Sequence, residues 1–136
     1  MLQARKWLAV AGGVGGALAI VAGAVGAHAL NLEPGTQGAH QYDTAVNYLL
    51  LHAIVVMLGH WCQPARRWLW DLARAAMLVG MVLFSGGLLL MIATGWRVPV
   101  IPAGGMSLIA GWLMAAVAVA QSTQEGGRRA AGKDQT

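Results

Sequence analysis

Residues 7–30 read WLAVAGGVGGALAIVAGAVGAHAL, an apolar run without a formal charge. Arg5 and Lys6 come before this run and Ala27-His28-Ala29 closes it, an arrangement that resembles a cleavable signal peptide. The apolar core of a signal peptide has only about 7–15 residues, whereas a helix that crosses a bilayer needs about 20. We therefore expect residues 7–30 to remain in the protein as its first transmembrane helix.

The composition indicates that lipid surrounds much of the chain. Of the 136 residues, 57% are hydrophobic and only 10% are charged, against about 25% charged in soluble domains. So few charged groups do not cover the surface of a water-soluble domain of this length, and the lipid bilayer is the expected partner of its outer surface. Cys62 is the only cysteine, which excludes a disulfide within the chain.

Three further apolar runs follow the first one. All four are continuous rather than alternating, which favours helices over strands, and Pro64, Pro99 and Pro102 help to separate them. The sequence thus predicts an all-α integral membrane protein, a compact bundle of four transmembrane helices with spans at about residues 7–30, 44–62, 75–94 and 103–120. We expect residues 1–121 to form this membrane domain and the polar residues 122–136 to form a disordered cytoplasmic tail.

The basic residues predict the orientation of the bundle. If all four runs cross the membrane, every Lys and Arg except Arg97 lies on the side of the two termini. Segments rich in Lys and Arg stay in the cytoplasm, so we expect both termini to be cytoplasmic and the membrane to be a bacterial cytoplasmic (inner) membrane. The net charge of +4 is then a sign of topology, and we expect no nucleic acid partner.

Small residues at helical spacing predict how the helices pack. A nucleotide-binding loop, the other use of such glycines, would need a preceding strand and a Lys followed by Ser or Thr. Small residues let helix backbones approach closely in a membrane, so we expect these faces to meet inside the bundle or, alternatively, between copies. The stripes are Gly12 and Gly16, then Gly15, Ala19, Gly23 and Ala27, in the first run; Ala73, Gly80, Gly87 and Thr94 along the third; and Gly104, Ser107, Gly111 and Ala115 in the fourth.

Polar residues follow one side of the second run. His40, Thr44, Tyr48 and His52 recur at four-residue steps. Polar groups in hydrocarbon cost free energy unless they are bonded, so we expect this side to face protein. His28 lies at the outer end of the first run, at a depth in the membrane close to that of residues 40–48. The sequence predicts a buried polar cluster made of His28, Thr44, Asn47, Tyr48, His52 and Ser85.

Three roles are open to this cluster. A hydrogen-bonded latch that fixes helix register is the preferred interpretation. A haem or metal site is disfavoured, because no carboxylate or thiolate accompanies the histidines and His28 and His52 differ in depth. A proton or small-solute path is the third role, although Asp43, at the boundary of a span, is the only carboxylate near one. We find no Ser-His-Asp set and no paired carboxylates, so we expect no enzyme and no cofactor or metal.

Four blocks of the sequence resemble the small bacterial membrane proteins of the family "domain of unknown function 423", whose eukaryotic relatives are called transmembrane protein 256. The resemblance spans roughly residues 11–115 and implies a four-helix inner-membrane protein without an assigned activity. We expect a structural or accessory protein that contacts itself or a larger membrane complex; the alternative is an oligomeric transporter or channel for protons or small solutes. The blocks are GALAIVAGAVGAHAL at 16–30, YDTAVNYLLLHA at 42–53, LFSGGLLLMIATG at 83–95 and IPAGGMSLIAGW at 101–112.

Overall fold

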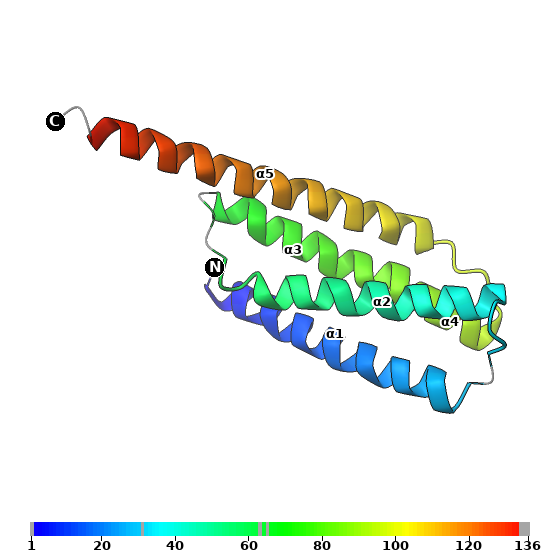
Figure 1. Ribbon diagram of the computed structural model, residues 1–136. Helices are drawn as coiled ribbons and strands as arrows, with labels where there is room; N and C mark the ends of the chain where they lie inside the picture. Colours follow the sequence, from blue (N-terminus) through cyan, green and yellow to red (C-terminus); the bar gives the residue numbers. More distant parts are fainter. Residues whose placement is uncertain (1, 31, 63, 65, 134–136) are drawn as a thin grey trace.

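The computed structural model describes residues 2–30, 32–62, 64 and 66–133, and it is helical, without a strand in these ranges. The prediction of an all-α protein is therefore confirmed. A π-helical segment, η1, joins α3 to α4 without a break. The elements are α1 (Leu2–His28), α2 (Gln37–Leu58), α3 (Arg67–Met81), η1 (Val82–Gly86), α4 (Gly87–Thr94) and α5 (Ile101–Lys133) (Figure 1).

Three segments of the described chain are long and apolar enough to cross a membrane: Gln3–His28, Arg67–Thr94 and Ile101–Ser122. These segments indicate a membrane protein. Helix α2 is not among them, because polar residues such as Asp43 and Asn47 interrupt its apolar sequence. The predicted second span therefore stays a prediction.

The helix boundaries differ from the predicted spans, most of all at three ends. Helix α2 begins at Gln37 rather than at residue 44, because the Thr36 side chain caps it by accepting a bond from the Ala39 N–H at 3.3 Å. Helix α3 begins at Arg67 rather than at residue 75. Helix α5 continues as backbone helix to Lys133, beyond the predicted end at residue 120. The predicted disorder of residues 122–136 stays a prediction, and residues 134–136 lie outside the described residues.

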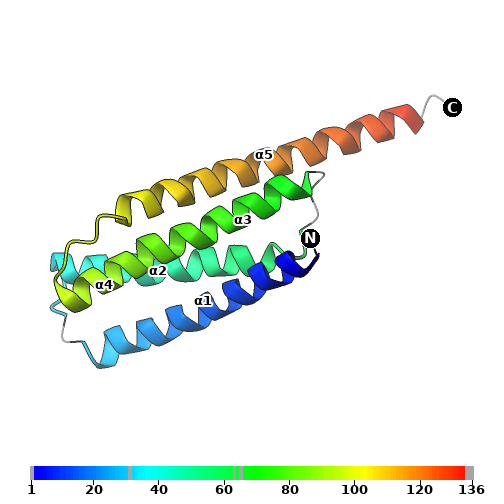
Figure 2. The same cartoon turned by 180° about the vertical axis from the view of Figure 1, so that it is seen from behind.

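Near the N-terminus the helices follow one another in the order α5, α3, α2 and α1 in both views of the ribbon, whereas at the other end the α3–α4 rod has crossed α2 and α4 appears on the α1 side of it (Figures 1 and 2). Helix α1 packs mainly on α2, and α5 packs mainly on α3 and η1. Both ends of the chain lie at the same end of the bundle as the connection from α2 to α3 (Figure 1). The connections from α1 to α2 and from α4 to α5 lie at the opposite end (Figure 1). The chain therefore returns to the end of the bundle from which it started.

Glycine brings α1 against α2. A Cβ atom at Gly12 would lie 2.7 Å from the Met57 nitrogen and 2.9 Å from the Ala53 oxygen, so the two backbones approach too closely for any side chain there. Ala19 is 1% exposed in the same seam. The Tyr42 hydroxyl also donates to the Ala22 carbonyl of α1 at 2.6 Å. The predicted small face of α1 is confirmed for Gly12, Gly15 and Ala19, which are buried, while Gly16 and Gly23 are half-buried and Ala27 is exposed.

A second seam of small residues joins α5 to α3 and η1. The Ser107 hydroxyl donates to the Ala76 carbonyl across it at 2.8 Å. Thr94, the last residue of the predicted stripe on the third run, is exposed and lies outside the seam. The buried members are Ala73, Gly80 and Gly87 on one side and Gly104, Gly111 and Ala115 on the other.

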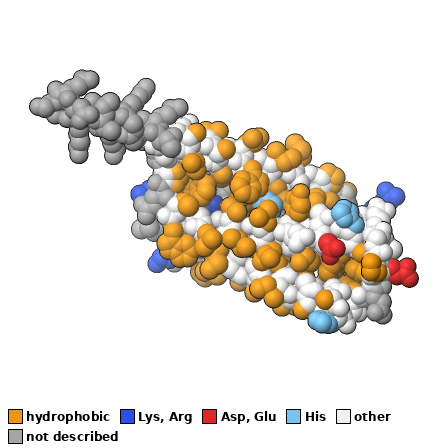
Figure 3. Space-filling model, viewed as in Figure 1, with side chains coloured by type: hydrophobic (Ala, Val, Ile, Leu, Met, Phe, Trp, Pro, Cys, Tyr) orange, Lys and Arg blue, Asp and Glu red, His pale blue; other side chains and the backbone are white. Residues whose placement is uncertain are grey.

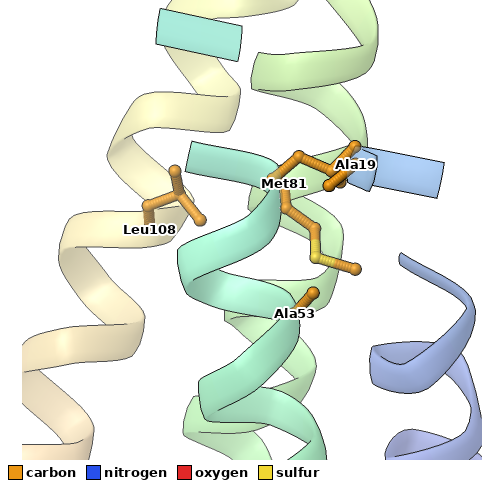
Figure 4. Close-up of a cluster of buried hydrophobic side chains, with 5 residues drawn as sticks. Ala19, Ala53, Met81 and Leu108 are labelled. Carbon is orange, nitrogen blue, oxygen red and sulfur yellow. The ribbon is translucent and has the colours of Figure 1, made fainter. Parts of the chain in front are cut away.

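The core lies where these seams converge. Its central cluster takes side chains from all the long helices, namely Ala19, Leu49, Ala53, Met81 and Leu108 (Figure 4). Outside this core, bulky apolar side chains cover the surface, and charged side chains gather toward the two ends (Figure 3). Ile20 of α1 is 69% exposed and Leu113 of α5 is 64% exposed. Such a surface matches a lipid environment rather than water.

Candidate functional site

The structure does not bring the six predicted polar residues together. His52 and Ser85 are buried, with 2% and 0% of their surface exposed. His28 and Asn47 are exposed, Tyr48 is 44% exposed, and half-buried Thr44 donates to the His40 carbonyl of its own helix at 2.8 Å. The prediction of one buried cluster is wrong for His28, Thr44, Asn47 and, in part, Tyr48.

The geometry of the helix explains this outcome. A step of four residues exceeds the 3.6-residue turn and moves a side chain about 40° around the axis. A stripe that repeats every four residues therefore drifts around the helix, and it runs from exposed His40 to buried His52. The side chains that α2 buries follow steps of three and four residues instead, and they are Tyr42, Ala45, Leu49, His52, Ala53 and Val56.

Both nitrogens of the His52 ring are engaged. Nδ1 lies 2.7 Å from the Tyr48 carbonyl oxygen, and the Trp112 indole N–H donates to Nε2 at 3.1 Å. A carbonyl can only accept and an indole can only donate. These partners assign the proton to Nδ1 and leave Nε2 as the acceptor. This tautomer satisfies both partners, since a proton on Nε2 would face the N–H of Trp112.

Aromatic rings extend this bond into a cluster that joins three elements. The ring centroids of Tyr48 and Phe84 lie 5.1 Å apart, and those of His52 and Trp112 lie 6.1 Å apart. We call Tyr48, His52, Phe84 and Trp112 the His52 cluster; it links α2 to η1 and α5. Sequence reasoning missed Phe84 and Trp112. An indole N–H in the middle of an apolar run needs an acceptor, and this was the available signal for Trp112.

Ser85 lies beside this cluster in sequence but has a different environment. It belongs to the π-helical segment η1, a type of helix that often marks functional sites. Its buried hydroxyl makes no hydrogen bond to any residue that the structure describes. The structure thus leaves Ser85 out of the hydrogen bonds of the His52 cluster.

A second polar site lies at the end of the bundle that holds the termini. Arg74 is 1% exposed, and its Nε and Nη2 donate to the Val56 carbonyl at 2.9 and 2.6 Å. Its Nη1 lies 3.7 Å from the Asp71 carboxylate, which also accepts from Arg5 Nε at 2.6 Å. We call Arg5, Asp71, Arg74 and the Val56 carbonyl the Arg74 cluster.

The Arg74 cluster fixes the corner between α2 and α3. The Val56 carbonyl belongs to the last turn of α2, where carbonyls lack partners within the helix and cations are favourable. Trp70 adds a bond from its indole N–H to the Gly59 carbonyl at 2.8 Å. The predicted third span, residues 75–94, leaves Arg74 in the connection before it, on the side of the termini. Arg74 does lie at the end that holds the termini, but its placement in a loop is wrong, because α3 begins at Arg67 and turns this side chain into the protein.

Chemistry beyond hydrogen bonding finds little support in the described residues. No group of three or more His, Cys, Asp or Glu side chains in this part of the chain could hold a metal ion. Asn47 lines a pocket of about 300 Å³ together with Asp43 and Tyr42, at the end opposite the termini. This pocket does not include His52.

Removing the indole donor tests the His52 cluster. We expect Trp112→Phe to lower the free energy of unfolding by about 1–2 kcal/mol, because Nε2 of buried His52 loses its partner. Trp96→Phe, at a residue 78% exposed, is the control and should change stability little. Reversible unfolding in mixed detergent micelles measures both. Equal stability of the two variants would show that the bond to His52 contributes nothing.

Comparison with known proteins gives one match. The family model described as "Protein of unknown function (DUF423)" matches residues 22–105. The matched region runs from α1 into the start of α5 and contains Tyr48, His52, Arg74 and Phe84, whereas Trp112 lies beyond it. No curated protein and no solved structure matches the chain.

Proposed function

Because the chain belongs to the family described as protein of unknown function DUF423, whose description names no activity, we propose a function from the geometry: a structural or accessory membrane protein. It acts through helix contacts with itself or with a larger membrane complex, and it is not an enzyme. It crosses the bacterial inner membrane four times, with both termini in the cytoplasm. The placement of both termini at one end of the bundle supports this topology, as do Arg5, Lys6 and Arg66 at that end.

The proposal includes α2 as a membrane span despite its polar residues. Its 22 residues extend about 33 Å at 1.5 Å per residue, enough for a hydrocarbon core of about 30 Å. It packs against α1 on one side and against α3, η1 and α4 on the other, while a strip that includes Asn47 and Tyr48 stays exposed. His52, in the C-terminal half of α2, is bonded within the protein, so this helix does not present that polar group to lipid.

The proposal rests on one observation: both ring nitrogens of His52 have partners within the protein. A residue that relays protons needs access to water and room for a second proton. His52 is 2% exposed, and its nitrogens are held by a carbonyl and by an N–H donor. A proton could enter only if Trp112 moved away. The cluster therefore acts as a latch between helices, and transport through His52 is the less favoured function.

The outer surface supports an accessory function. Side chains such as Ile20, Leu113 and Met106 point away from the bundle with more than half of their surface exposed. Van der Waals contact between such surfaces and neighbouring helices is one way that membrane helices associate. The small residues, in contrast, are used within the bundle.

Reconstitution distinguishes the two functions. We expect vesicles that contain the full chain to leak protons and small solutes no faster than protein-free vesicles, and His52→Gln to change nothing. Isolation from native membranes in a gentle detergent should yield a defined assembly of this chain with itself or with a constant partner. A flux that exceeds the protein-free level and disappears in folded His52→Gln would contradict the accessory function and support a transporter.

A further inference from the structure

A groove separates α1 from α3 at the end of the bundle that holds the termini. It encloses about 800 Å³, and its walls are mainly apolar. Leu8 and Ala11 contribute from α1, while Leu72 and Ala75 contribute from α3. Leu72 is 48% exposed. No helix of the described chain fills this space.

A second cavity of about 710 Å³ lies between α1 and the rod formed by α3, η1 and α4, and residues such as Leu18, Val21, Val82 and Leu89 line it. Both cavities therefore lie between α1 and the same helical rod. The two cavities share no lining residue, and the Met81 side chain lies against Gly15 between them, so each is a separate apolar surface suited to hydrocarbon.

Two tryptophans line the groove near the termini, and basic residues lie close to them in sequence. Trp7 and Trp68 line it and are 64% and 61% exposed. Lys6 directly precedes Trp7 and Arg66 lies two residues before Trp68, and both basic residues are exposed. Asp71 also lines the groove, but its carboxylate is bound to Arg5 at 2.6 Å and lies 3.7 Å from Arg74. One carboxylate between two guanidinium groups leaves this end positively charged.

We propose that the groove binds an anionic phospholipid of the inner leaflet. One acyl chain lies between α1 and α3, and the phosphate lies near Lys6 and Arg66, with Trp7 and Trp68 at the level of the headgroup. Basic pockets between helices on the cytoplasmic side select anionic headgroups, and Trp favours the membrane interface. A transmembrane helix would fill the apolar walls equally well, but it would offer no phosphate to Lys6 and Arg66.

Binding of single lipids to the full chain tests this proposal. Native mass spectrometry from micelles measures the affinity for added phosphatidylglycerol and for added phosphatidylcholine. We expect phosphatidylglycerol to bind more tightly, and Lys6→Gln and Arg66→Gln each to weaken it about fivefold. Arg97→Gln, at the opposite end of the bundle, should have no effect. Equal affinities for the two lipids, or equal effects of the three substitutions, would overturn the proposal.

A substitution that fills the groove tests whether the lipid binds there or is only attracted to the surface charge. Ala75→Leu places a larger side chain on the α3 wall and should weaken phosphatidylglycerol binding without removing a charge. Ala11→Leu does the same from α1 if the first variant does not fold. Unchanged binding in a folded variant would show that the lipid lies outside the groove. Photo-crosslinking from position 72 in native membranes should yield a lipid adduct, and a discrete protein adduct instead would show that a helix occupies the groove.

Discussion

Replacing Arg74 with leucine is expected to lower the free energy of unfolding by about 2–4 kcal/mol. The guanidinium is 1% exposed and makes two bonds to the Val56 carbonyl. Leucine fills much of the space but donates nothing, so this carbonyl at the end of α2 would stay buried without a donor. Asp71 would keep only its bond to Arg5. The corner between α2 and α3 would therefore lose its main polar contact.

Two further variants make the Arg74 prediction specific. Arg74→Lys keeps the charge but replaces a planar fork of donors with a single ammonium group, and we expect a loss between that of leucine and zero. Arg66→Gln changes an exposed arginine at the same corner and should stay within about 0.5 kcal/mol of the wild type. Unfolding in mixed micelles measures all three. A leucine variant as stable as Arg66→Gln would contradict a structural function for the Arg74 cluster.

Replacing Gly104 with alanine is expected to cost about 1–3 kcal/mol, because the added methyl group overpacks the seam between α5 and η1. Its Cβ would overlap the Phe84 nitrogen and would lie 2.9 Å from the Leu83 carbonyl carbon. These are backbone atoms, so no side-chain rotation relieves the contact. Helix α5 would have to move away from the π-helical segment.

Gly105 supplies the matched control. A Cβ at Gly105 would meet only the Phe84 ring, at 3.7 Å, which is an ordinary contact. Alanine favours a helix over glycine by about 1 kcal/mol, so Gly105→Ala should leave stability unchanged or raise it. The same unfolding measurement applied to both variants should thus give effects of opposite sign. If both variants gained stability, the close approach of α5 at Gly104 would be wrong.

The sequence predicted the apolar packing better than the polar site. Small residues at helical spacing identify a close helix contact directly, because only they allow the backbones to meet. The buried positions Gly12, Ala73 and Gly104 follow from this rule. Thr94 and Ala27 belong to the same predicted stripes but are exposed. Each stripe extends beyond the length over which its two helices touch.

The polar residues could not be placed from periodicity alone. Thr44 and His52 share a four-residue pattern but differ in burial, because that pattern drifts around the helix. The partner of His52 is Trp112, which comes from α5 and is distant in sequence. Arg74 was assigned to a loop because charges next to apolar runs usually mark their ends. Only the tertiary structure shows that α3 begins earlier and buries this side chain.

The central claim is that α2 crosses the membrane between α1 and α3, so that the His52 cluster lies within a four-span bundle. Labelling with a membrane-impermeant maleimide tests this most directly, because exposed Cys62 follows α2 and Glu33 precedes it. We expect Cys62 to react only after the inner membrane is permeabilised. In a Cys62→Ser background, Glu33→Cys should react in spheroplasts with an intact inner membrane. Reaction of both positions from the same side would show that α2 does not cross, and would contradict this account.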